Sequence, residues 1–571
     1  MSKNTKRGLL FQASILATAG IISRVIGLLY GSPLAAIIGD EGNGYYATAS
    51  EIYAIILLIS SYSIPSAMAK IISQKLAVND YINTHRIFLC ALVYVTIVGA
   101  SGGIFIFFFA NYLAVGRSAI VLRFYAPTIF LFGYLGVLRG YFQAHRTMVP
   151  TSVSQLVEQI INAITSIGAA IILTNIAGSE DSSKRAVYGA IGGTLGTSAG
   201  VVLALLFMIC IYCHNRKSII KKIEADTHPK QSKIEIFILI FLVVTPFIFS
   251  TFIYNFSTSL NATLFSRILL YVRKLDETDI ATMYGVFSRK AMTIIKLPIS
   301  IASAVAAAMI PEISSLYAKG DNVGANNTIT KVTKITIMIT IPCAVGLFCL
   351  SKPVIMILFP QKESMEQAAY LLRMLSISVV FYSLSTVTNA VLQGMGKIIL
   401  PVINAFLALI IQTTVLILLL LYTNIGTSSL CIVTIIYSLL MCILNSLSIK
   451  KLITTTIDYK KTYVFPVISA TFMGCVVYLL YLFVNYIAFY IGNIPFISYS
   501  SNMLFTDFVY SNYIVNLVST IISIFVGICV YFVALIRTGG TTEEEIIKIP
   551  KGKSIVLFLK NLHLINTTDS K

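Results

Sequence analysis

Charged side chains stand inside long apolar runs of this sequence, where lipid rather than water is the expected surrounding. An ionisable group at the centre of a bilayer costs about 2.5–3.5 kcal/mol or more, so it should face a cavity and act there. The side chains concerned are Arg24, Glu51, Arg123, Glu158, Arg267, Arg289, Lys290, Lys296 and Arg373. Cations outnumber glutamates, and the guanidinium group suits bidentate contact with phosphate. The pattern predicts a cationic cavity and an anionic substrate, most simply a phosphate or pyrophosphate.

The position of each cation along its run decides its predicted role. We assign the substrate cavity to Arg24, Arg267, Arg289, Lys296 and Arg123. Arg289 and Lys296 are seven residues apart, two helical turns, so both should lie on one helix face. Lys290 points about 100° away from that face and is expected at the membrane interface. For Arg123, near the end of its run, snorkelling to the surface is an equal alternative.

Two glutamates complete the predicted site. Glu51 and Glu158 are candidate counter-ions or coupling groups. For Glu158 a structural alternative is an ion pair with Arg139 or Arg24.

The sequence lacks the signatures of catalysis that these residue types would otherwise suggest. No aqueous loop contains an HExxH motif, a GxSxG motif or a paired-carboxylate constellation. Gly552-Lys553-Ser554 lacks the upstream glycine of a phosphate-binding loop. The outer acidic group Asp276, Glu277 and Asp279 reads as a solvated turn. We therefore expect neither an enzyme nor a cofactor, and we expect the membrane potential or an ion gradient to supply the driving force.

The cysteines do not indicate a metal site. Cys210 and Cys213 have CxxC spacing, but no second pair follows. We expect them to be buried small apolar side chains, and we predict no metal ligands.

Composition decides the class of protein. Of the 571 residues, 57% are hydrophobic and 11% are charged, and the mean hydropathy is +0.85. Soluble domains are nearer 45–50% apolar and roughly 25% charged. The net charge of +19 lies mostly in short loops between apolar runs, which is the pattern of membrane topology signals and not of nucleic-acid binding.

Apolar runs long enough for a helix to cross a bilayer of about 30 Å define fourteen predicted spans. They are 9–30, 45–69, 87–112, 120–142, 149–174, 187–213, 236–271, 281–310, 331–350, 367–392, 399–422, 427–449, 462–488 and 514–536. The lysines and arginines concentrate in loops on one side, which places both termini in the cytoplasm. The prediction is an all-α, multi-pass protein of the bacterial cytoplasmic membrane.

An internal repeat divides the spans. At an offset of 241, Ala67-Met68, Ser73, Ala77 and Asp80 fall on Ala308-Met309, Ser314, Ala318 and Asp321. At 243, Ser23-Arg24 falls on Ser266-Arg267, and at 250–251, Gln143 and Pro150 fall on Gln393 and Pro401. Six spans separate the copies, so both have one orientation. We expect Arg24 and Arg267, equivalent in the two copies, to face each other.

The repeat gives the predicted domains, with helices 13 and 14 as additions. They are an N-terminal lobe (1–213), a basic cytoplasmic linker (214–233), a C-terminal lobe (234–449), helices 13–14 (450–537) and a cytoplasmic tail (538–571). Transporters built this way bind substrate between their halves.

Three stretches carry a family resemblance. They are GLLYGSPLAAIIGDEGNGYY (27–46), RGYFQAHRTMVPTSVSQLVEQI (139–160) and KLPISIASAVAAAMIPEISSLYAKGD (296–321). The chain resembles the stage V sporulation protein B-like branch of the lipid II flippase (MurJ-like) family, in the multidrug/oligosaccharidyl-lipid/polysaccharide exporter superfamily. The resemblance implies fourteen helices, a central cationic cavity, a groove at helices 13–14 for the lipid tail, and an undecaprenyl-pyrophosphate glycan such as lipid II as cargo.

Some residues match that branch and others depart from it. Arg24 matches the family's arginine in helix 1, whereas Gly31 stands where the branch has another arginine. Arg289 and Lys296 stand where the branch has a small residue and an asparagine. Compared with that branch, this chain therefore carries less positive charge at the end of its first predicted span (9–30) and more in its eighth (281–310).

Two alternatives remain open beside a monomeric flippase that binds a lipid-linked oligosaccharide among membrane lipids. One is an exporter of another polysaccharide repeat unit. The other is a cation-coupled multidrug antiporter of the same superfamily, whose cavity should be acidic.

Overall fold

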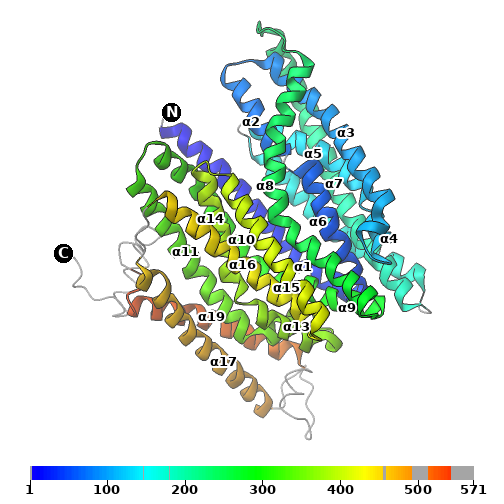
Figure 1. Cartoon of the computed structure of the whole chain (residues 1–571), viewed down its shortest axis with the longest axis vertical. Coiled ribbons are helices and arrows are strands. Elements are labelled where there is room, and N and C mark those ends of the chain that lie inside the picture. Colours follow the sequence, from blue (N-terminus) through cyan, green and yellow to red (C-terminus); the bar gives the residue numbers. More distant parts are fainter. Residues whose placement is uncertain are drawn as a thin grey trace, which may run out of the picture. The chain divides into compact units, whose positions relative to one another are not determined.

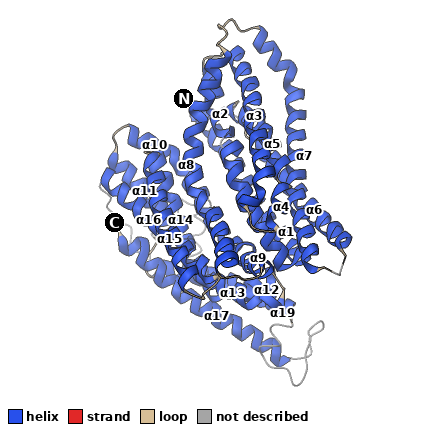
Figure 2. Cartoon of the chain, turned by 45° about the vertical axis from the view of Figure 1, so that its right-hand side comes forward, coloured by secondary structure: helices blue, strands red, loops and turns tan. Residues whose placement is uncertain are grey.

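The structure, a computed structural model, describes residues 3–62, 64–145, 147–178, 181–453, 458–491 and 512–541, and in these ranges it contains helices and no strands (Figure 2). The first half holds α1 (Lys3–Leu57), α2 (Ile64–Ala77), α3 (Tyr81–Leu113), α4 (Ser118–Arg123), α5 (Ala126–Ala144), α6 (Val149–Ala177), α7 (Ser182–Glu224), α8 (Lys233–Arg267) and α9 (Glu277–Gly285). The second half holds α10 (Met292–Ala318), α11 (Asn322–Cys349), α12 (Ser351–Leu358), α13 (Lys362–Leu375), α14 (Ser378–Gly394), α15 (Ile399–Tyr422), α16 (Ser428–Leu452), α17 (Phe465–Ile491) and α19 (Tyr513–Arg537). The predicted tail lies outside the described residues from 542 onward.

The predicted all-α membrane fold is confirmed, and each of the fourteen predicted spans coincides with helical segments. Within the described residues, ten helices are long and apolar enough to cross a membrane, or eleven if the bent pair α13–α14 is one span. One of the ten is the 60-residue stretch Thr18–Ala77, which covers two predicted spans. The count of fourteen is consistent with these helices.

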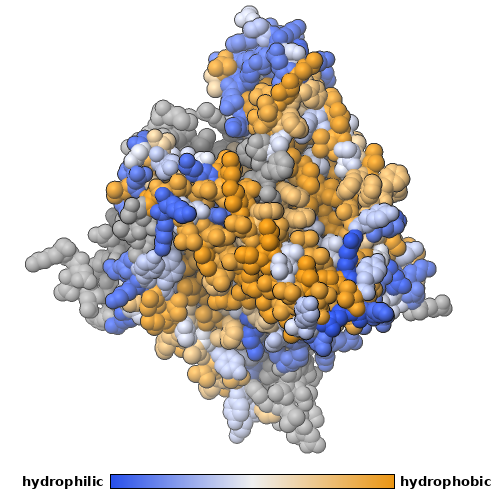
Figure 3. Space-filling model, in the orientation of Figure 1, coloured by the Kyte–Doolittle hydropathy of each residue, from blue (hydrophilic) through white to orange (hydrophobic). Residues whose placement is uncertain are grey.

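Apolar side chains cover the outside of the helices, as a lipid environment requires. In Figure 3 they gather over α8 and α15, and hydrophilic side chains gather toward helix ends. Leu479 is 64% exposed and Phe525 is 69% exposed, which in water would cost roughly 1.5–3 kcal/mol for each side chain. Cys210 and Cys213 are exposed on α7, so the expectation that they are buried is wrong; their apolar surroundings make them lipid-facing.

The chain divides into two compact units. Unit 1 comprises Met1–Arg289 with Ala405–Leu430, and unit 2 comprises Lys290–Asn404 with Cys431–Lys571. In unit 1, α3, α5 and α7 run side by side in Figures 1 and 2. The lobes predicted from the repeat have other boundaries and stay a prediction.

The segment between the first two predicted spans is helical, and a break at Gly39 lets α1 turn there. Gly39 has φ +70°, a backbone conformation that glycine adopts without a steric cost. A break leaves carbonyl groups without helical partners, which is costly away from water. Asn43 Nδ2 donates to Ala35 O at 3.2 Å and to Gly39 O at 2.7 Å. The asparagine therefore satisfies the carbonyls at the break and lets the helix continue.

Small residues bring α6 and α7 into close contact along much of their length. Gly192, Gly196 and Gly200 lie four residues apart and therefore on one face of α7. A Cβ atom at Gly196 would lie 1.9 Å from Ser166 Oγ, and one at Gly200 would lie 2.5 Å from Glu158 O. Close backbone approach of this kind drives helix association in lipid. It fixes α6 and the side chains that α6 presents to α1.

The two copies of the internal repeat have the same turn. In the first, Asp80 N donates to Lys75 O; in the second, Asp321 N donates to Leu316 O, and both distances are 3.0 Å. Each aspartate then caps the next helix by accepting from a backbone N–H three residues on. The preceding residues, Asn79 (φ 58°) and Gly320 (φ 74°), both adopt the left-handed conformation. Shared local geometry at the predicted offset supports a real duplication.

In the first copy this turn also fastens the loop between α7 and α8. Asn83 Nδ2 donates to Pro229 O at 2.8 Å, and Asn83 Oδ1 accepts from Gln231 N at 2.8 Å. Asp226 Oδ2 accepts from Ile82 N at 2.8 Å. We call these contacts the loop latch.

The acidic groups of the loop latch are saturated with donors. Asp80, Asp226 and His228 place possible ligand atoms within 4.8 Å of one another, yet hydrogen bonds occupy each carboxylate. Asp80 accepts from Asn83 and pairs with Lys75 at 3.3 Å. Although burial acts to raise it, hydrogen bonds from Ile82 and His228 hold the pKa of Asp226 well below its ordinary value. The carboxylates of Asp80 and Asp226 are therefore ionised at neutral pH, and their hydrogen bonds are intact.

We expect Asn83→Gly, which copies the residue at the equivalent position 324, to release the loop and keep the helix. Gln231 N would lose its acceptor, so trypsin should cut the Lys230–Gln231 bond several-fold faster in limited proteolysis. Asp321→Ala is the matched comparison: it removes a cap worth about 1 kcal/mol and should lower the thermal midpoint without changing cleavage at Lys230. Equal cleavage of Asn83→Gly and the parent chain would contradict the loop latch.

Candidate functional site

The part of α1 beyond its break packs directly on α9, and only glycine fits at the contact. A Cβ atom at Gly44 would lie 1.8 Å from Ala281 O. One at Gly285 would lie 2.4 Å from Asp40 O and 2.7 Å from Gly44 N. In each case the obstructing atom belongs to the backbone, so a rotamer change gives no relief. The two glycines fix how closely α1 and α9 approach.

Polar contacts close one end of this helix pair. Glu277 Oε1 accepts from Arg117 N at 2.6 Å, which joins the start of α9 to the start of α4. Arg117 Nη1 lies 3.8 Å from Glu41 Oε1, and Tyr45 OH donates to Glu41 at 2.9 Å. The carboxylate of Glu277, assigned to a solvated turn from the sequence, instead fills the space beside Gly116 (φ +55°). The prediction is therefore wrong for Glu277, whereas Asp276 and Asp279 are exposed, as predicted.

Arg289 lies on a π-helical turn that follows α9 directly. The turn spans Val286–Ala291, and π-helical turns inside α-helices are frequent at functional sites. The guanidinium carbon lies 4.6 Å from the centre of the Tyr46 ring. A cation over an aromatic face gains about 0.5–2 kcal/mol, more as it is desolvated. Half-buried Arg289 is thus held in place by a ring, and within the described residues its donors stay available for other contacts.

The π-helical turn also changes the predicted relation between Arg289 and Lys296. Seven residues make two turns only in an uninterrupted α-helix, and a π-helical turn shifts that phase. Arg289 is half-buried and Lys296 is exposed. The seven-residue spacing alone therefore does not place the two side chains on one face, and their shared face stays a prediction.

Tyrosines from α1 and from the start of α5 gather near Tyr46, whose ring lies against Arg289. Tyr30 OH accepts from Asn162 Nδ2 at 3.2 Å, which ties α1 to α6. The rings of Tyr53 and Tyr125 stack at 4.2 Å with an interplanar angle of 16°. Offset stacking adds about 0.5–1.5 kcal/mol to the area buried. We call Tyr30, Tyr46, Tyr53, Tyr125, Asn162 and Arg289 the tyrosine cluster.

Glu158 is committed to an ion pair. Arg139 Nη2 lies 2.8 Å from Glu158 Oε2, and Arg139 Nε donates to Ser154 Oγ at 2.9 Å. The two charged side chains are 8% and 16% exposed. Of the alternatives for Glu158, the structure places it in the pair with Arg139. The pair neutralises itself, so its carboxylate does not cancel the charge of Arg289.

Two of the predicted cavity cations lie at one end of α3. Arg123 donates through Nε to Phe107 O at 3.3 Å and through Nη2 to Asn111 Oδ1 at 3.2 Å. Arg267 Nη2 donates to the carbonyl of Tyr112. The last carbonyls of a helix carry partial negative charge and attract cations. The structure therefore groups these arginines with the end of α3 and not with the tyrosine cluster.

The remaining predicted residues are spread over both units. Arg24 is exposed on α1, and its pairing with Arg267 across a cavity stays a prediction. Glu51 is half-buried on α1, close enough to Tyr284 of α9 to act on it electrostatically. Lys290 is fully buried and donates to Ser364 Oγ at 2.6 Å, so the prediction of an interfacial lysine is wrong. Arg373 packs over the Phe348 ring at 5.9 Å.

The site predicted from the sequence does not include the tyrosines, because they were treated only as apolar residues of the spans. A usable signal was present, since Tyr46 and Tyr53 are seven residues apart and lie on one helix face. Tyr30 and Tyr125 carry no such spacing, and only tertiary packing shows that they belong to the same cluster.

Comparisons with known proteins agree with this architecture. Residues 9–317 match the family described as polysaccharide biosynthesis protein, and residues 256–418 match the MatE family.

Curated relatives come from Bacillus subtilis (strain 168). Lipid II flippase MurJ is 24% identical over 419 residues, covering 70% of this chain and 75% of the relative. Stage V sporulation protein B is 23% identical over 463 residues, covering 78% of this chain and 84% of the relative.

Solved structures share the fold. An inward closed structure of lipid II flippase MurJ has a TM-score of 0.61 at 17% identity and covers 96% of this chain and 99% of its own. An inward-facing multidrug resistance MATE family transporter of the same superfamily has a TM-score of 0.62 at 17% identity and covers 76% and 94%. At these identities the likeness shows the fold alone.

Substitution of Gly44 by alanine should separate α1 from α9. The added Cβ atom meets backbone, so we expect a loss of about 1–3 kcal/mol, the range for overpacking. Gly346→Ala is the control, because its Cβ atom would meet nothing within 4 Å and alanine favours a helix by about 1 kcal/mol. The midpoint temperature of thermal unfolding in detergent, followed by circular dichroism, should fall for Gly44→Ala and not for Gly346→Ala. Equal midpoints would contradict the close contact.

Breaking the Arg139–Glu158 pair should cost more than removing both charges. We expect Arg139→Met or Glu158→Leu alone to destabilise the protein by about 3 kcal/mol, because each leaves an uncompensated buried charge. The double variant should recover most of that loss. The same thermal assay measures all three, and additive losses would show that the two side chains do not interact.

Proposed function

Because the chain belongs to the polysaccharide biosynthesis protein family, within the multidrug/oligosaccharidyl-lipid/polysaccharide exporter superfamily, we propose that it moves an undecaprenyl-pyrophosphate-linked glycan of the lipid II type from the inner to the outer leaflet. It is a multi-pass membrane transporter and not an enzyme. We place it in the bacterial cytoplasmic membrane as a monomer, with both termini in the cytoplasm.

The proposal rests mainly on the partial burial of Arg289 and on its contact with the Tyr46 ring. Its guanidinium is half-buried over Tyr46, on an element that packs against α1. Arginine held by a ring is preorganised for bidentate contact with phosphate oxygens. Tyr30 and Asn162 add hydroxyl and amide groups able to bond a sugar or a phosphate. A pyrophosphate joined to a glycan requires this combination of cation and neutral polar groups.

The contact of α1 with α9 supports a transport cycle by alternating access. The glycine contact and the Glu277–Arg117 contact close one end of this helix pair. Alternating access requires that this end of the helix pair is closed in one state of the transporter and open in another. We assign the closed end to the outer side, on the topology predicted from the lysines and arginines.

The membrane potential is the driving force that we propose. With the inside negative, each exported negative charge gains about 2.3 kcal/mol per 100 mV. A headgroup with two phosphate charges could therefore move outward without ATP. Flipping in sealed vesicles should accelerate when an inside-negative potential is imposed and slow when it is reversed.

A cation-coupled multidrug antiporter is the alternative that the MatE match and the MATE-like fold support. Such a protein needs an acidic cavity for a cationic cargo. Here Glu158 is paired with Arg139, and the charged member of the tyrosine cluster is the cation Arg289. The local charge thus favours an anionic cargo, whether lipid II or another polysaccharide repeat unit.

Replacement of Arg289 by alanine tests the proposal. In sealed liposomes, translocation of labelled lipid II should fall by about tenfold or more, the loss expected for a hydrogen bond to a charged group worth about 1.5–3 kcal/mol. Arg289→Lys should keep part of the rate. Arg185→Ala is the control, because Arg185 is an exposed arginine at the start of α7.

Transport assays with other cargoes distinguish the lipid II flippase from the two alternative functions. Transport of a different pyrophosphate-linked glycan, lost in Arg289→Ala, would keep the site and change the cargo. Efflux of a cationic dye driven by protons or sodium, without glycan transport, would replace the proposal by the antiporter.

A further inference from the structure

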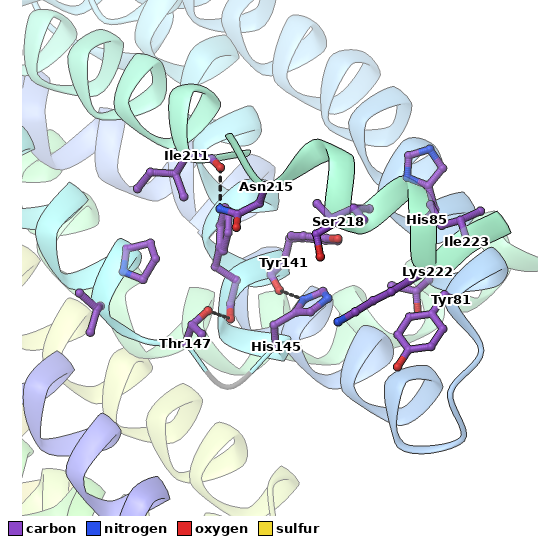
Figure 4. A pocket seen from close by; sticks show the side chains of 15 residues that line it. Tyr81, His85, Tyr141, His145, Thr147, Ile211, Asn215, Ser218, Lys222 and Ile223 are labelled. Atoms are coloured by element: carbon purple, nitrogen blue, oxygen red, sulfur yellow. Dashed lines mark hydrogen bonds between the residues drawn. The ribbon is translucent and has the colours of Figure 1, made fainter. Parts of the chain in front are cut away.

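A second site lies away from the tyrosine cluster, in unit 1. A cavity of about 480 Å³ opens where the start of α3, the end of α5 and the last turns of α7 meet (Figure 4). Its walls share no residue with the tyrosine cluster. The ligand of this cavity therefore need not be the transported cargo.

One wall of this cavity is aromatic and aliphatic. Tyr141, Phe142, Ile211 and Ile219 line it. The Tyr141 ring is held from behind by Phe88 at 5.0 Å and Tyr212 at 5.8 Å. This wall can take up apolar surface, at roughly 25 cal/mol for each Å² removed from water.

The polar lining is cationic and contains no carboxylate among the described residues. Lys222 lies over the Tyr81 ring, 5.7 Å from its centre, and its ammonium group points toward the His145 ring in Figure 4. His85 lines the cavity as well, and its Nδ1 atom is buried without a hydrogen-bond partner among the described residues. Asn215, Ser218 and Thr147 add neutral donors. An anion is the ligand that such a lining accepts.

The cavity lies at the membrane surface. The predicted span of α7 ends at residue 213, and α7 continues to Glu224, so Asn215, Ser218 and Lys222 stand beyond the apolar core. Arg216, Lys217 and Lys221 surround them on the same helix. Basic segments beside a span bind the anionic lipids of the cytoplasmic leaflet, and basic pockets between helices bind their headgroups.

We propose that this cavity binds the headgroup of an anionic phospholipid, with the phosphate between Lys222 and His145 and the glycerol and first acyl carbons against the wall of Tyr141 and Phe142. The lysine provides a point charge that a phosphate accepts in any orientation. The aromatic wall distinguishes a lipid from a free phosphate ion.

His145 makes the binding depend on pH. Its Nδ1 lies 2.9 Å from Tyr141 O, and a carbonyl only accepts, so Nδ1 carries the proton and Nε2 of the neutral ring is an acceptor. The ring can donate to a phosphate through Nε2 only when it is protonated. The charged and titratable groups that line the cavity beside it are Lys222 on α7, Tyr81 and His85 on α3, and Tyr141 on α5.

The sign of this dependence follows from the surroundings of the ring. Burial lowers the pKa of His145, with Lys222 adding to the effect and the Tyr141 carbonyl opposing it. An anion favours the protonated form, so affinity should rise as the pH falls below the ordinary histidine pKa of about 6.5.

Native mass spectrometry of the purified full chain, with added phosphatidylglycerol or phosphatidylethanolamine, tests the proposal. Phosphatidylglycerol should bind more tightly, and Lys222→Gln should weaken it about fivefold, the equivalent of roughly 1 kcal/mol for one basic residue at an anionic surface. Lys221→Gln is the matched control: it removes the same charge one residue away, from a side chain that does not line the cavity. His145→Asn should keep binding at pH 7.5 and lose the gain seen at pH 5.5.

Three outcomes would overturn the proposal. Equal affinity for the two lipids would remove the role of charge. Equal loss in Lys221→Gln and Lys222→Gln would assign binding to the diffuse charge of α7. Displacement of the lipid by inorganic phosphate alone would show that the aromatic wall contributes nothing.

Discussion

The close contact of α1 with α9 is the constraint on which the rest of unit 1 depends. Gly44 and Gly285 let two backbones approach to distances that no side chain allows. Only at this separation can the π-helical turn after α9 place Arg289 over Tyr46. The neighbouring contact between α6 and α7 works in the same way and holds Asn162 against Tyr30. In lipid, where the hydrophobic effect does not drive helices together, such backbone contacts determine the packing.

Much of the fold could be predicted from the sequence, because a bilayer imposes a length and a composition on each helix that crosses it. The apolar runs located the helices, and the offset of 241 located two turns with the same hydrogen bonds. The segment 31–44 lies between two predicted spans, and its helical structure is not indicated by the apolar runs. Its helical state depends on Asn43, whose side chain bonds carbonyls that no local pattern marks as free.

The candidate site was predictable only in its chemistry. Ranking charges by their cost in lipid found Arg289, Glu158 and Lys290. Their partners depend on contacts between distant segments: Glu158 with Arg139, and Lys290 with Ser364, 74 residues away. The π-helical turn at Val286–Ala291 has no sequence signature that we could use, and it broke the spacing argument for Lys296. The high cost of a charge in lipid thus indicates that the side chain has a partner. It does not indicate whether that partner is a protein group or the substrate.

The turns at Asp80 and Asp321 have the same hydrogen bonds, and a difference at one position changes what each turn can contact. Both keep the aspartate cap and the left-handed residue before it, which are conditions for reversing the chain at all. Position 83 is asparagine in the first turn, where it holds the loop between α7 and α8; its equivalent, Gly324, has no side chain to do so. The same turn geometry therefore reverses the chain in both places, and at Asp80 it also anchors a second loop through one amide side chain, so that the two turns are alike in backbone and unlike in what they hold.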